Sequence, residues 1–234
     1  MNENIFSGKA EVYMKCRPRY AQGVLDFIRR ETALTPDSLI ADIGAGTGIF
    51  TGQLMSLGCR VAAVEPNGDM RSRIAGLPDG SVSLITAAES FHWFQPDDFR
   101  EECRRILRPD GKVMIVWNLT DKKSSLVRTL HKLNLDHCAR YRELFSNGRS
   151  IESERFVDIS QKFLKNYSSA IFKNDLSYNK SQFIGNRISS SYAPKSGDPE
   201  FDKYCTALEE FFEQHQQNGV ILIPNNTVCF IGMA

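Results

Sequence analysis

Paired cysteines, long apolar runs and clustered charge are all absent from this chain of 234 residues. Its six cysteines lie far apart and never form a Cys-x-x-Cys pair, so neither a zinc site nor a disulfide framework is expected. No apolar run approaches the length that spans a bilayer, and Met1–Phe6 lacks the pattern of a secretion signal. We therefore expect a cytoplasmic protein with reduced, buried thiols and no membrane partner.

The charges of the chain nearly cancel. The 29 Lys and Arg residues against 28 Asp and Glu residues give a formal net charge of +1. No basic run is interleaved with aromatic residues, so the sequence does not indicate a nucleic-acid partner. Hydrophobic residues make up 41% of the chain, which is enough for a folded α/β core. The oligomeric state is left open by the composition.

Apolar periodicity in the first half of the chain alternates between strand and helix. A turn is predicted at Arg108–Lys112, where Pro109 presets the backbone and Gly111 supplies a positive φ. This alternation predicts an α/β fold, a Rossmann-like, doubly wound and mostly parallel sheet. The predicted strands are 39–43, 60–64, 81–88 and 112–117, and the predicted helices are 18–31, 49–57 and 97–107.

The second half is more polar and predicts a helical cap. We expect a single domain, with a cofactor-binding half at 1–118, a cap that contacts the substrate at 119–218 and a closing segment at 219–234. The last strand is expected to be antiparallel, at the edge of the sheet. The elements predicted here are helices at 122–145 and 201–212 and strands at 167–173, 220–223 and 227–231.

The most informative motif follows the first predicted strand. Residues 42–48 read Asp-Ile-Gly-Ala-Gly-Thr-Gly, and glycines at this spacing let the backbone approach a ligand closely. A dinucleotide fingerprint requires a third glycine where Ile49 stands, which disfavours a nicotinamide-dependent reductase. No Lys-Ser or Lys-Thr pair follows, so a loop for nucleoside triphosphates is excluded.

Two acidic residues flank this glycine turn. Asp42 precedes it and would repel a pyrophosphate, but it would attract a ligand that carries an ammonium and a sulfonium group. Glu65 ends the second predicted strand, where a carboxylate can accept hydrogen bonds from both hydroxyls of a ribose. The two acids together favour S-adenosylmethionine as the cofactor.

Five motifs in order resemble the class I S-adenosylmethionine-dependent methyltransferases. They are residues 42–48, Val64-Glu-Pro-Asn67, Leu84-Ile-Thr-Ala-Ala88, Phe91-His-Trp-Phe94 and Leu107-Arg-Pro-Asp-Gly111. More narrowly, the His-Trp-Phe and the segment 6–20 resemble the small-molecule branch related to trans-aconitate methyltransferase. The resemblance covers about 6–118 well and the cap only loosely.

This resemblance implies in-line transfer of a methyl group from S-adenosylmethionine to a small-molecule acceptor, either a carboxylate or a hydroxyl. The glycine turn would line the methionyl part, Glu65 would hold the ribose and Pro66 would border the adenine. For Tyr13 and Arg17, closure over the methionyl end and a surface helix entry are both open. The residues implied in cofactor binding are Asp42, Gly44, Ala45, Gly46, Thr47, Gly48, Glu65, Pro66, Ala87, Ala88, Glu89, Tyr13 and Arg17.

The resemblance also implies a substrate pocket walled by Phe91, His92, Trp93 and Trp117. His92 is the candidate catalytic residue, which would orient the acceptor or accept its proton. A packed histidine bonded to a backbone carbonyl is the open alternative. Positioning alone can supply most of the acceleration in such a displacement, so a carboxylate acceptor needs no base. No metal site is expected.

The segment between Glu65 and Ser83 is shorter than this family requires. Family members carry a helix, a third strand and an acidic segment there, and the residues present cannot form all three. A natural deletion, a trimmed version of the gene and a segment absent from the sequence remain open. Loss of the third strand would remove part of the adenine site, which leaves a catalytically weak or inactive cofactor-binding regulator as the alternative function.

Overall fold

The computed structural model describes residues 18–65, 76–145 and 152–234, so Cys16 and the predicted contacts of Tyr13, Arg17 and Pro66 lie outside the described residues. The chain divides into two compact units. The sheet unit comprises Arg19–Leu119, Glu154–Asn174 and Asn226–Ala234, and the helical unit lies within Thr120–Ser153 and Asp175–Asn225. Residues 154–174, expected in the cap, therefore belong to the sheet unit.

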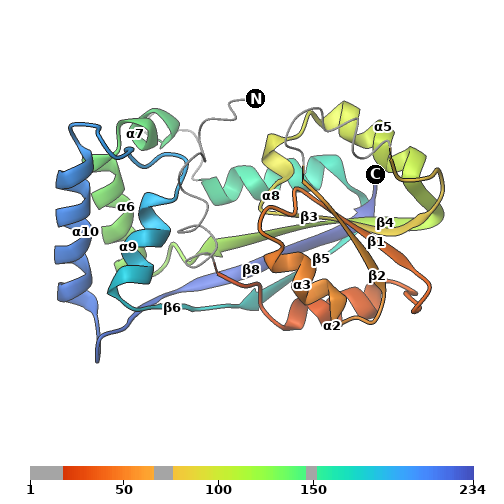
Figure 1. Cartoon of the computed structure of the whole chain (residues 1–234), viewed down its shortest axis with the longest axis horizontal. Coiled ribbons are helices and arrows are strands. Elements are labelled where there is room, and N and C mark those ends of the chain that lie inside the picture. Colours follow the sequence, from red (N-terminus) through yellow and green to blue (C-terminus); the bar gives the residue numbers. More distant parts are fainter. Residues whose placement is uncertain (1–17, 66–75, 146–151) are drawn as a thin grey trace. The chain divides into compact units, whose positions relative to one another are not determined.

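The sheet unit is built on six strands in the order β2-β1-β3-β4-β8-β5 (Figure 1). β1 pairs in parallel with β2 and β3, β3 pairs in parallel with β4, and β5 is antiparallel to β8. This sheet confirms the predicted Rossmann-like fold class. The strands are β1 Leu39–Ile43, β2 Arg60–Val64, β3 Val82–Ala88, β4 Leu107–Thr120, β5 Lys165–Lys173 and β8 Asn225–Met233.

The two edges of the sheet were considered in the sequence analysis, one for the last strand and the other for the missing third strand. The last strand, β8, was expected at an edge and instead lies between β4 and β5, because β5 pairs along its outer side. At the opposite end, β2 is the outermost strand formed by the described residues. The third strand of the related family thus has no counterpart outside β2 in this part of the chain.

Alternating side chains of the strands β1, β3 and β4 are buried on both faces of the sheet, as is typical of parallel strands. Ile40, Leu84 and Met114 point to the face covered by the helices α2 (Gly23–Glu31) and α3 (Ile49–Met55). The other face carries the neighbouring strand residues and is covered by α5 (Pro96–Ile106) and α8 (Glu152–Phe163) (Figure 1). The neighbouring strand residues on that second face are Ala41, Ile43, Ile85, Ala87, Val113 and Ile115.

The turn predicted at Arg108–Lys112 is an irregularity within β4. Val82 of β3 pairs with Leu107, and Leu84 pairs with Lys112, so the extra residues of β4 bulge between these pairs. Gly111 is not at positive φ. A Cβ atom there would lie 2.8 Å from Leu107 Cδ2 and 3.1 Å from the Val82 carbonyl oxygen. Close packing, rather than turn conformation, is therefore what requires glycine.

The helical unit differs from the sequence prediction in two places. The single helix expected over 122–145 is two helices, α6 (Ser125–His137) and α7 (Ala139–Phe145), because Cys138 is extended at φ −118° and ψ 103°. Between residues 145 and 201 the sequence predicted only the strand 167–173. The structure also contains β6 (Leu176–Tyr178) and α9 (Lys180–Ile188) there, and α8 in the sheet unit was not predicted either.

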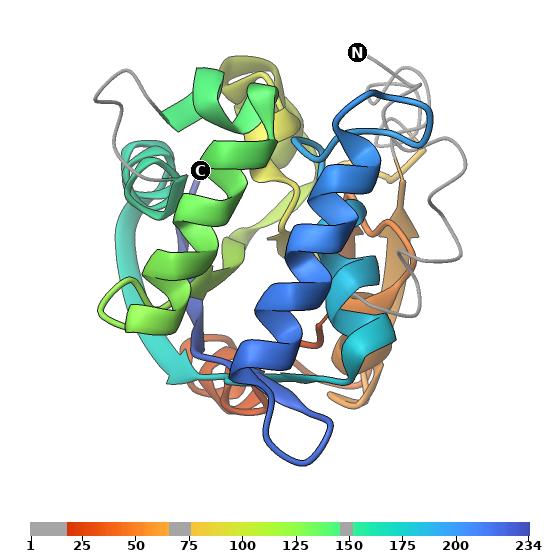
Figure 2. The same cartoon turned by 90° about the vertical axis from the view of Figure 1, so that its left-hand side faces the viewer.

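The α9 helix begins with a capping box, a signal that was present in the sequence. The Asn179 side chain accepts a hydrogen bond from the Gln182 backbone N–H, and the Gln182 side chain accepts one from the Asn179 N–H. The predicted C-terminal helix is confirmed as α10 (Phe201–His215), which contacts α6 and α9 (Figure 2, α10 in blue and α6 in green). Finally, β7 (Ile221–Ile223) pairs with β6 in a separate two-stranded sheet.

The five cysteines in the described ranges are free; Cys103, Cys138 and Cys229 are buried as expected, whereas Cys59 and Cys205 are only half-buried. Burial raises the pKa of the Cys138 thiol to about 11. No helix in the described part of the chain is both long and apolar enough to cross a bilayer. Within the same residues, no three His, Cys, Asp or Glu side chains are arranged to hold a metal ion.

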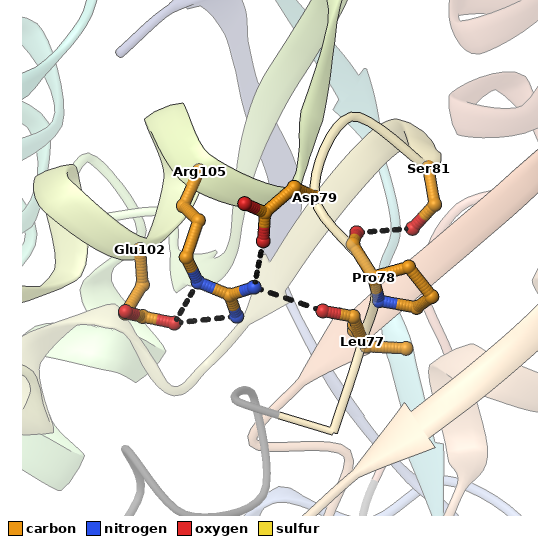
Figure 3. A network of polar contacts seen from close by, with 6 residues as sticks. All are labelled: Leu77, Pro78, Asp79, Ser81, Glu102 and Arg105. Carbon is orange, nitrogen blue, oxygen red and sulfur yellow. Dashed lines mark hydrogen bonds and ion pairs between the residues drawn. The ribbon is translucent and has the colours of Figure 1, made fainter.

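Arg105 fixes the point at which the chain re-enters the sheet after the short segment (Figure 3). Its Nη1 donates to Asp79 Oδ1 at 2.6 Å and to the Leu77 carbonyl at 3.0 Å. Its Nε and Nη2 both donate to Glu102 Oε2, at 3.1 and 2.9 Å. These bonds raise the pKa of Arg105, Glu102 contributing most. The start of β3 is thus held to α5 independently of residues 66–75.

We expect Arg105→Met to lower the free energy of unfolding by about 1–2 kcal/mol, because it removes charge-assisted bonds to two carboxylates and a carbonyl. Urea denaturation of the variant and the wild type measures this difference. Arg104→Met is the matched control, since Arg104 is exposed on the same helix, and it should change the free energy by less than about 0.5 kcal/mol. Equal losses in the two variants would contradict the assigned role.

Candidate functional site

Three loops meet at the carboxyl ends of neighbouring strands. Gly44–Gly48 follows β1, Glu65 follows β2, and Glu89–His92 follows β3. β2 and β3 lie on opposite sides of β1, so the chain leaves β1 toward one neighbour and later returns on the other side. Such a switch point opens a crevice in doubly wound folds, and ligands bind there.

The glycine turn lies where the sequence predicted it, between β1 and α3. Gly44, Gly46 and Gly48 have φ values of 73°, 54° and 78°, a region that disfavours other residues. A Cβ atom on Gly44 would lie 2.4 Å from Ser90 Cβ, whereas one on Gly46 would meet nothing within 4 Å. Gly44 therefore permits close packing of two loops, and Gly46 leaves open space beside the turn.

Both neighbouring strands hold this turn in place. The N–H groups of Gly44 and Ala45 donate to the Val64 carbonyl at the end of β2, at 2.8 and 3.3 Å. From the β3 side, the Ser90 hydroxyl donates to the Ile43 carbonyl at 2.8 Å. Thr47 lies at the exposed outer side of the turn. The turn is thus a fixed backbone element rather than a free loop.

Glu65 reaches back onto the glycine turn. The Gly46 N–H donates to Glu65 Oε2 at 2.5 Å, across a gap of 19 residues in sequence. Gly46 is exposed and Glu65 is half-buried, so this contact lies at the surface of the crevice. A single ligand that touches the turn can therefore also reach the Glu65 carboxylate.

Asp42 is buried directly beneath the turn, with 1% of its surface exposed. Its two carboxylate oxygens accept hydrogen bonds from Thr51 of α3 at 2.6 Å and from Thr86 of β3 at 2.7 Å. Burial raises the pKa of Asp42, the two hydroxyl donors act in the opposite direction, and the charge of Glu65 raises it further. Asp42 thereby ties together β1, α3 and β3.

The two threonines were not assigned to the site from the sequence. Thr86 is a buried polar residue inside an apolar strand, and that contrast was the available signal. Thr51 lies in the first turns of the helix that follows the glycines, where the period of 3.6 residues can bring a side chain back toward the preceding strand.

Of the three residues expected beside the sulfonium, Ala88 and Glu89 are half-buried at the carboxyl end of β3. Glu89 has a φ of 54°, which is uncommon for a side chain of its size and turns the chain sharply after β3. Its carboxylate accepts a hydrogen bond from the Asn118 N–H at 2.5 Å. Ala88 is half-buried, whereas Ala87 is fully buried in the core and presents no side-chain surface to a ligand.

The residues expected to wall the substrate pocket differ in burial: some are partly exposed and others are fully buried. His92 is half-buried in the short helix Phe91–Trp93, and its ring centroid lies 4.6 Å from Trp93 and 5.1 Å from Phe156. Trp93 is 38% exposed. Trp117, in contrast, is fully buried and stacked on Phe156 at 4.2 Å.

Phe91 and Trp117 are therefore core residues, in contrast to the expected pocket wall. Phe91 packs against the rings of Phe94, Phe99 and Phe163. The indole N–H of Trp117 donates to Ser160 Oγ at 2.9 Å, which satisfies the polar end of the buried ring. Phe156 and Ser160 were missed from the sequence because α8 was not predicted there.

The segment that contains this site is similar in sequence to proteins named methyltransferases. Residues 41–115 match the methyltransferase domain family. The chain is 32% identical over 148 residues to an uncharacterized methyltransferase-like protein of Schizosaccharomyces pombe, with 56% of each chain covered. It is 31% identical over 144 residues to an uncharacterized methyltransferase of Mycobacterium bovis, covering 55% of this chain and 58% of that one. The aligned part thus spans little more than half the length of these curated relatives.

Solved structures extend the likeness in fold over nearly the whole chain. A candidate type II methyltransferase from Anaeromyxobacter dehalogenans superposes with a TM-score of 0.58 at 19% identity, covering 93% of this chain and 97% of that one. A candidate methyltransferase from Anabaena variabilis gives 0.55 at 19% identity, covering 88% and 95%. At this identity the likeness shows the fold alone, which is the Rossmann-like methyltransferase fold.

We expect Thr86→Val to lower the free energy of unfolding by about 2 kcal/mol at pH 7, because it removes a hydrogen bond to a buried carboxylate without changing the shape. The pKa of Asp42 is already raised in the folded state, so folded protein binds its proton more tightly, and the loss of a donor raises the pKa further. The destabilisation should therefore shrink as the pH falls to about 4, near the model-peptide pKa of Asp.

Urea denaturation of the Thr86→Val variant at the two pH values measures this difference. Thr129→Val is the control, since Thr129 is exposed on α6. A destabilisation that is independent of pH would show that Asp42 does not depend on the Thr86 hydroxyl.

Proposed function

We propose that this chain, whose residues 41–115 match the methyltransferase domain family, transfers a methyl group from S-adenosylmethionine to a small-molecule acceptor. The observation that carries the proposal is the contact between Gly46 and Glu65. It brings an acid suited to a ribose diol against a glycine turn suited to close backbone contact, at the switch point of the sheet. We include in the proposal the narrower likeness to the trans-aconitate branch.

The residues present fit this cofactor. The left-handed glycines and the open space at Gly46 admit a ligand against the backbone. The acidic side chains Asp42 and Glu65 suit hydroxyl donors and a cationic sulfonium, and they disfavour phosphates. When bound, S-adenosylmethionine supplies the electrophilic methyl group. The roles of Tyr13, Arg17 and Pro66 stay predictions from the resemblance.

Three acidic residues of the site then have distinct proposed roles. Glu65 exchanges or shares its bond to the Gly46 N–H with the ribose hydroxyls. Asp42 lies below the turn as a buried negative charge, held by two hydroxyls, and favours the positive methionyl end. Glu89 is oriented by the Asn118 N–H at the next strand end, so its carboxylate has one preset direction near the reacting groups.

His92 is proposed to orient the acceptor. Its imidazole packs near Trp93, Phe156 and Trp117, with the Trp117 centroid at 5.6 Å, so the ring has few directions available. An in-line displacement depends on the approach angle of the acceptor, and a rigid neighbour can fix it. For a hydroxyl acceptor the same ring can also take up the proton, whereas a carboxylate acceptor needs no base.

A second candidate function is a cofactor-binding regulator with weak or no catalysis. The observation that favours it is that β2 is the outermost described strand on the side where the family places its adenine site. Binding of S-adenosylhomocysteine by calorimetry, together with turnover of labelled S-adenosylmethionine against a panel of small carboxylates and phenols, separates the two functions. Binding without turnover across the panel would favour the regulator.

We expect Glu65→Gln to weaken the binding of S-adenosylhomocysteine by about 10- to 100-fold, because hydrogen bonds to a charged acceptor contribute about 1.5–3 kcal/mol. Calorimetry measures the dissociation constant. The exposed Glu101→Gln variant carries the same change of charge away from the crevice and should bind as the wild type does. If both variants bind equally well, Glu65 has no part in the cofactor site.

We expect His92→Ala to lower kcat by about 10- to 100-fold once an acceptor is known, with the affinity for S-adenosylhomocysteine nearly unchanged, because positioning of the acceptor is lost and the cofactor contacts remain. Steady-state kinetics and calorimetry on the same preparation give both quantities. His215→Ala, on α10, serves as the control. A wild-type rate would remove His92 from the mechanism.

A further inference from the structure

Arg187 is a half-buried cation in the helical unit. It lies in the last turn of α9, and its Nε is buried with no hydrogen-bond partner among the described residues. Its Nη2 donates to the side-chain oxygen of Asn186 at 2.5 Å. Within the described ranges, no Asp or Glu carboxylate forms an ion pair with it. A buried N–H of a charged group that lacks a hydrogen-bond partner is costly.

Aromatic side chains from several elements converge on this guanidinium. Its Cζ lies 5.9 Å from the centroid of the Phe183 ring. Burial lowers the pKa of Arg187, but the hydroxyls of four tyrosines raise it, and the net direction is upward, so the charge is kept. These tyrosines come from α7, β6, the segment after α9, and α10, and they are Tyr141, Tyr178, Tyr192 and Tyr204.

Hydrogen bonds fix the directions of two of these tyrosine hydroxyls. Tyr204 donates to Oδ1 of the buried Asn134 at 2.9 Å. The Tyr141 hydroxyl lies 2.7 Å from Nδ1 of His131. Burial lowers the pKa of His131, and the charge of Lys122 lowers it further, so this imidazole is neutral at pH 7 and adds no cation. The hydroxyls near Arg187 are therefore preset polar groups in an otherwise apolar cluster.

A planar guanidinium with a buried, unused N–H is suited to an oxyanion. Its fork of donors matches two oxygens of a carboxylate or a phosphate, and burial strengthens such bonds. The surrounding aromatic rings can contact an apolar body attached to the anion. A neutral ligand would leave the buried charge uncompensated.

We propose that Arg187, within this cluster of aromatic side chains, binds the oxyanion of a small ligand, a carboxylate or a phosphate group. The site is argued from the helical unit alone and goes beyond the proposed function.

Titration of the whole chain with inorganic phosphate, benzoate and neutral benzamide, followed by calorimetry, tests the proposal. We expect the wild type to bind phosphate or benzoate and not benzamide, and Arg187→Met to bind the same anion at least about tenfold more weakly. Arg187→Lys should lie between them, because it keeps the charge and loses the fork. Arg140→Met removes an exposed charge from the same unit and should bind as the wild type does.

The probes also distinguish the two sources of the anion. Binding of benzoate alone indicates a carboxylate ligand, and binding of phosphate alone indicates a phosphorylated one. Failure of the wild type to bind either anion, or equal affinity in the wild type and Arg187→Met, would overturn the proposal.

A thermal unfolding experiment separates binding from a structural role. Without anion, Arg187→Met should melt at or above the midpoint of the wild type, because it removes an uncompensated buried charge. The anion that binds should raise the midpoint of the wild type and of Arg140→Met, but not that of Arg187→Met. A lower midpoint in both Arg187→Met and Arg187→Lys, with no effect of the anion on the wild type, would show a structural arginine.

Binding of S-adenosylhomocysteine is measured on the same samples. Loss of that binding with anion binding intact would count against the proposed function only. The reverse result would count against the Arg187 site only.

Discussion

The buried carboxylate of Asp42 is the constraint on which the rest of the sheet unit depends. One side chain accepts hydrogen bonds from Thr51 of α3 and Thr86 of β3, so three elements are fixed relative to one another. Because the glycine turn begins two residues later, its geometry follows from this arrangement. A buried carboxylate with both donors in place is stable, whereas one with a donor missing is costly. The site is therefore built on an interaction that also specifies the fold.

The two proposed sites use buried charge in opposite ways. Asp42 has its hydrogen-bond partners within the chain, and in the proposed function its charge favours the cationic cofactor. Arg187 has a buried N–H without a partner among the described residues, so an external anion would complete it. Both follow the same rule, that a charge taken out of water must be compensated. The glycine turn belongs to the sheet unit and Arg187 to the helical unit.

Adjacent aromatic residues of one sequence motif can have different positions, one in the core and the next at the candidate site. Phe91 and His92 are adjacent, yet Phe91 is buried against three other rings and His92 is half-buried beside the exposed Trp93. A short helix turns neighbouring residues to different sides, and α8 contacts both, Phe91 through Phe163 and His92 through Phe156. The motif predicted a segment near the end of β3, and the side chains packed around that segment determine which of its residues are accessible to a ligand.

The sequence by itself determined the elements whose signals are local. The bounds of β1 and β2, the place of the glycine turn and the acids beside it were all predicted, because periodicity and glycine spacing act within a few residues. Tertiary structure alone decided the burial of Ala87 and Trp117, the break at Cys138 and the tyrosines around Arg187. Those features depend on contacts between residues far apart in the chain, and burial by a distant helix leaves no periodic signal at the residue that it covers.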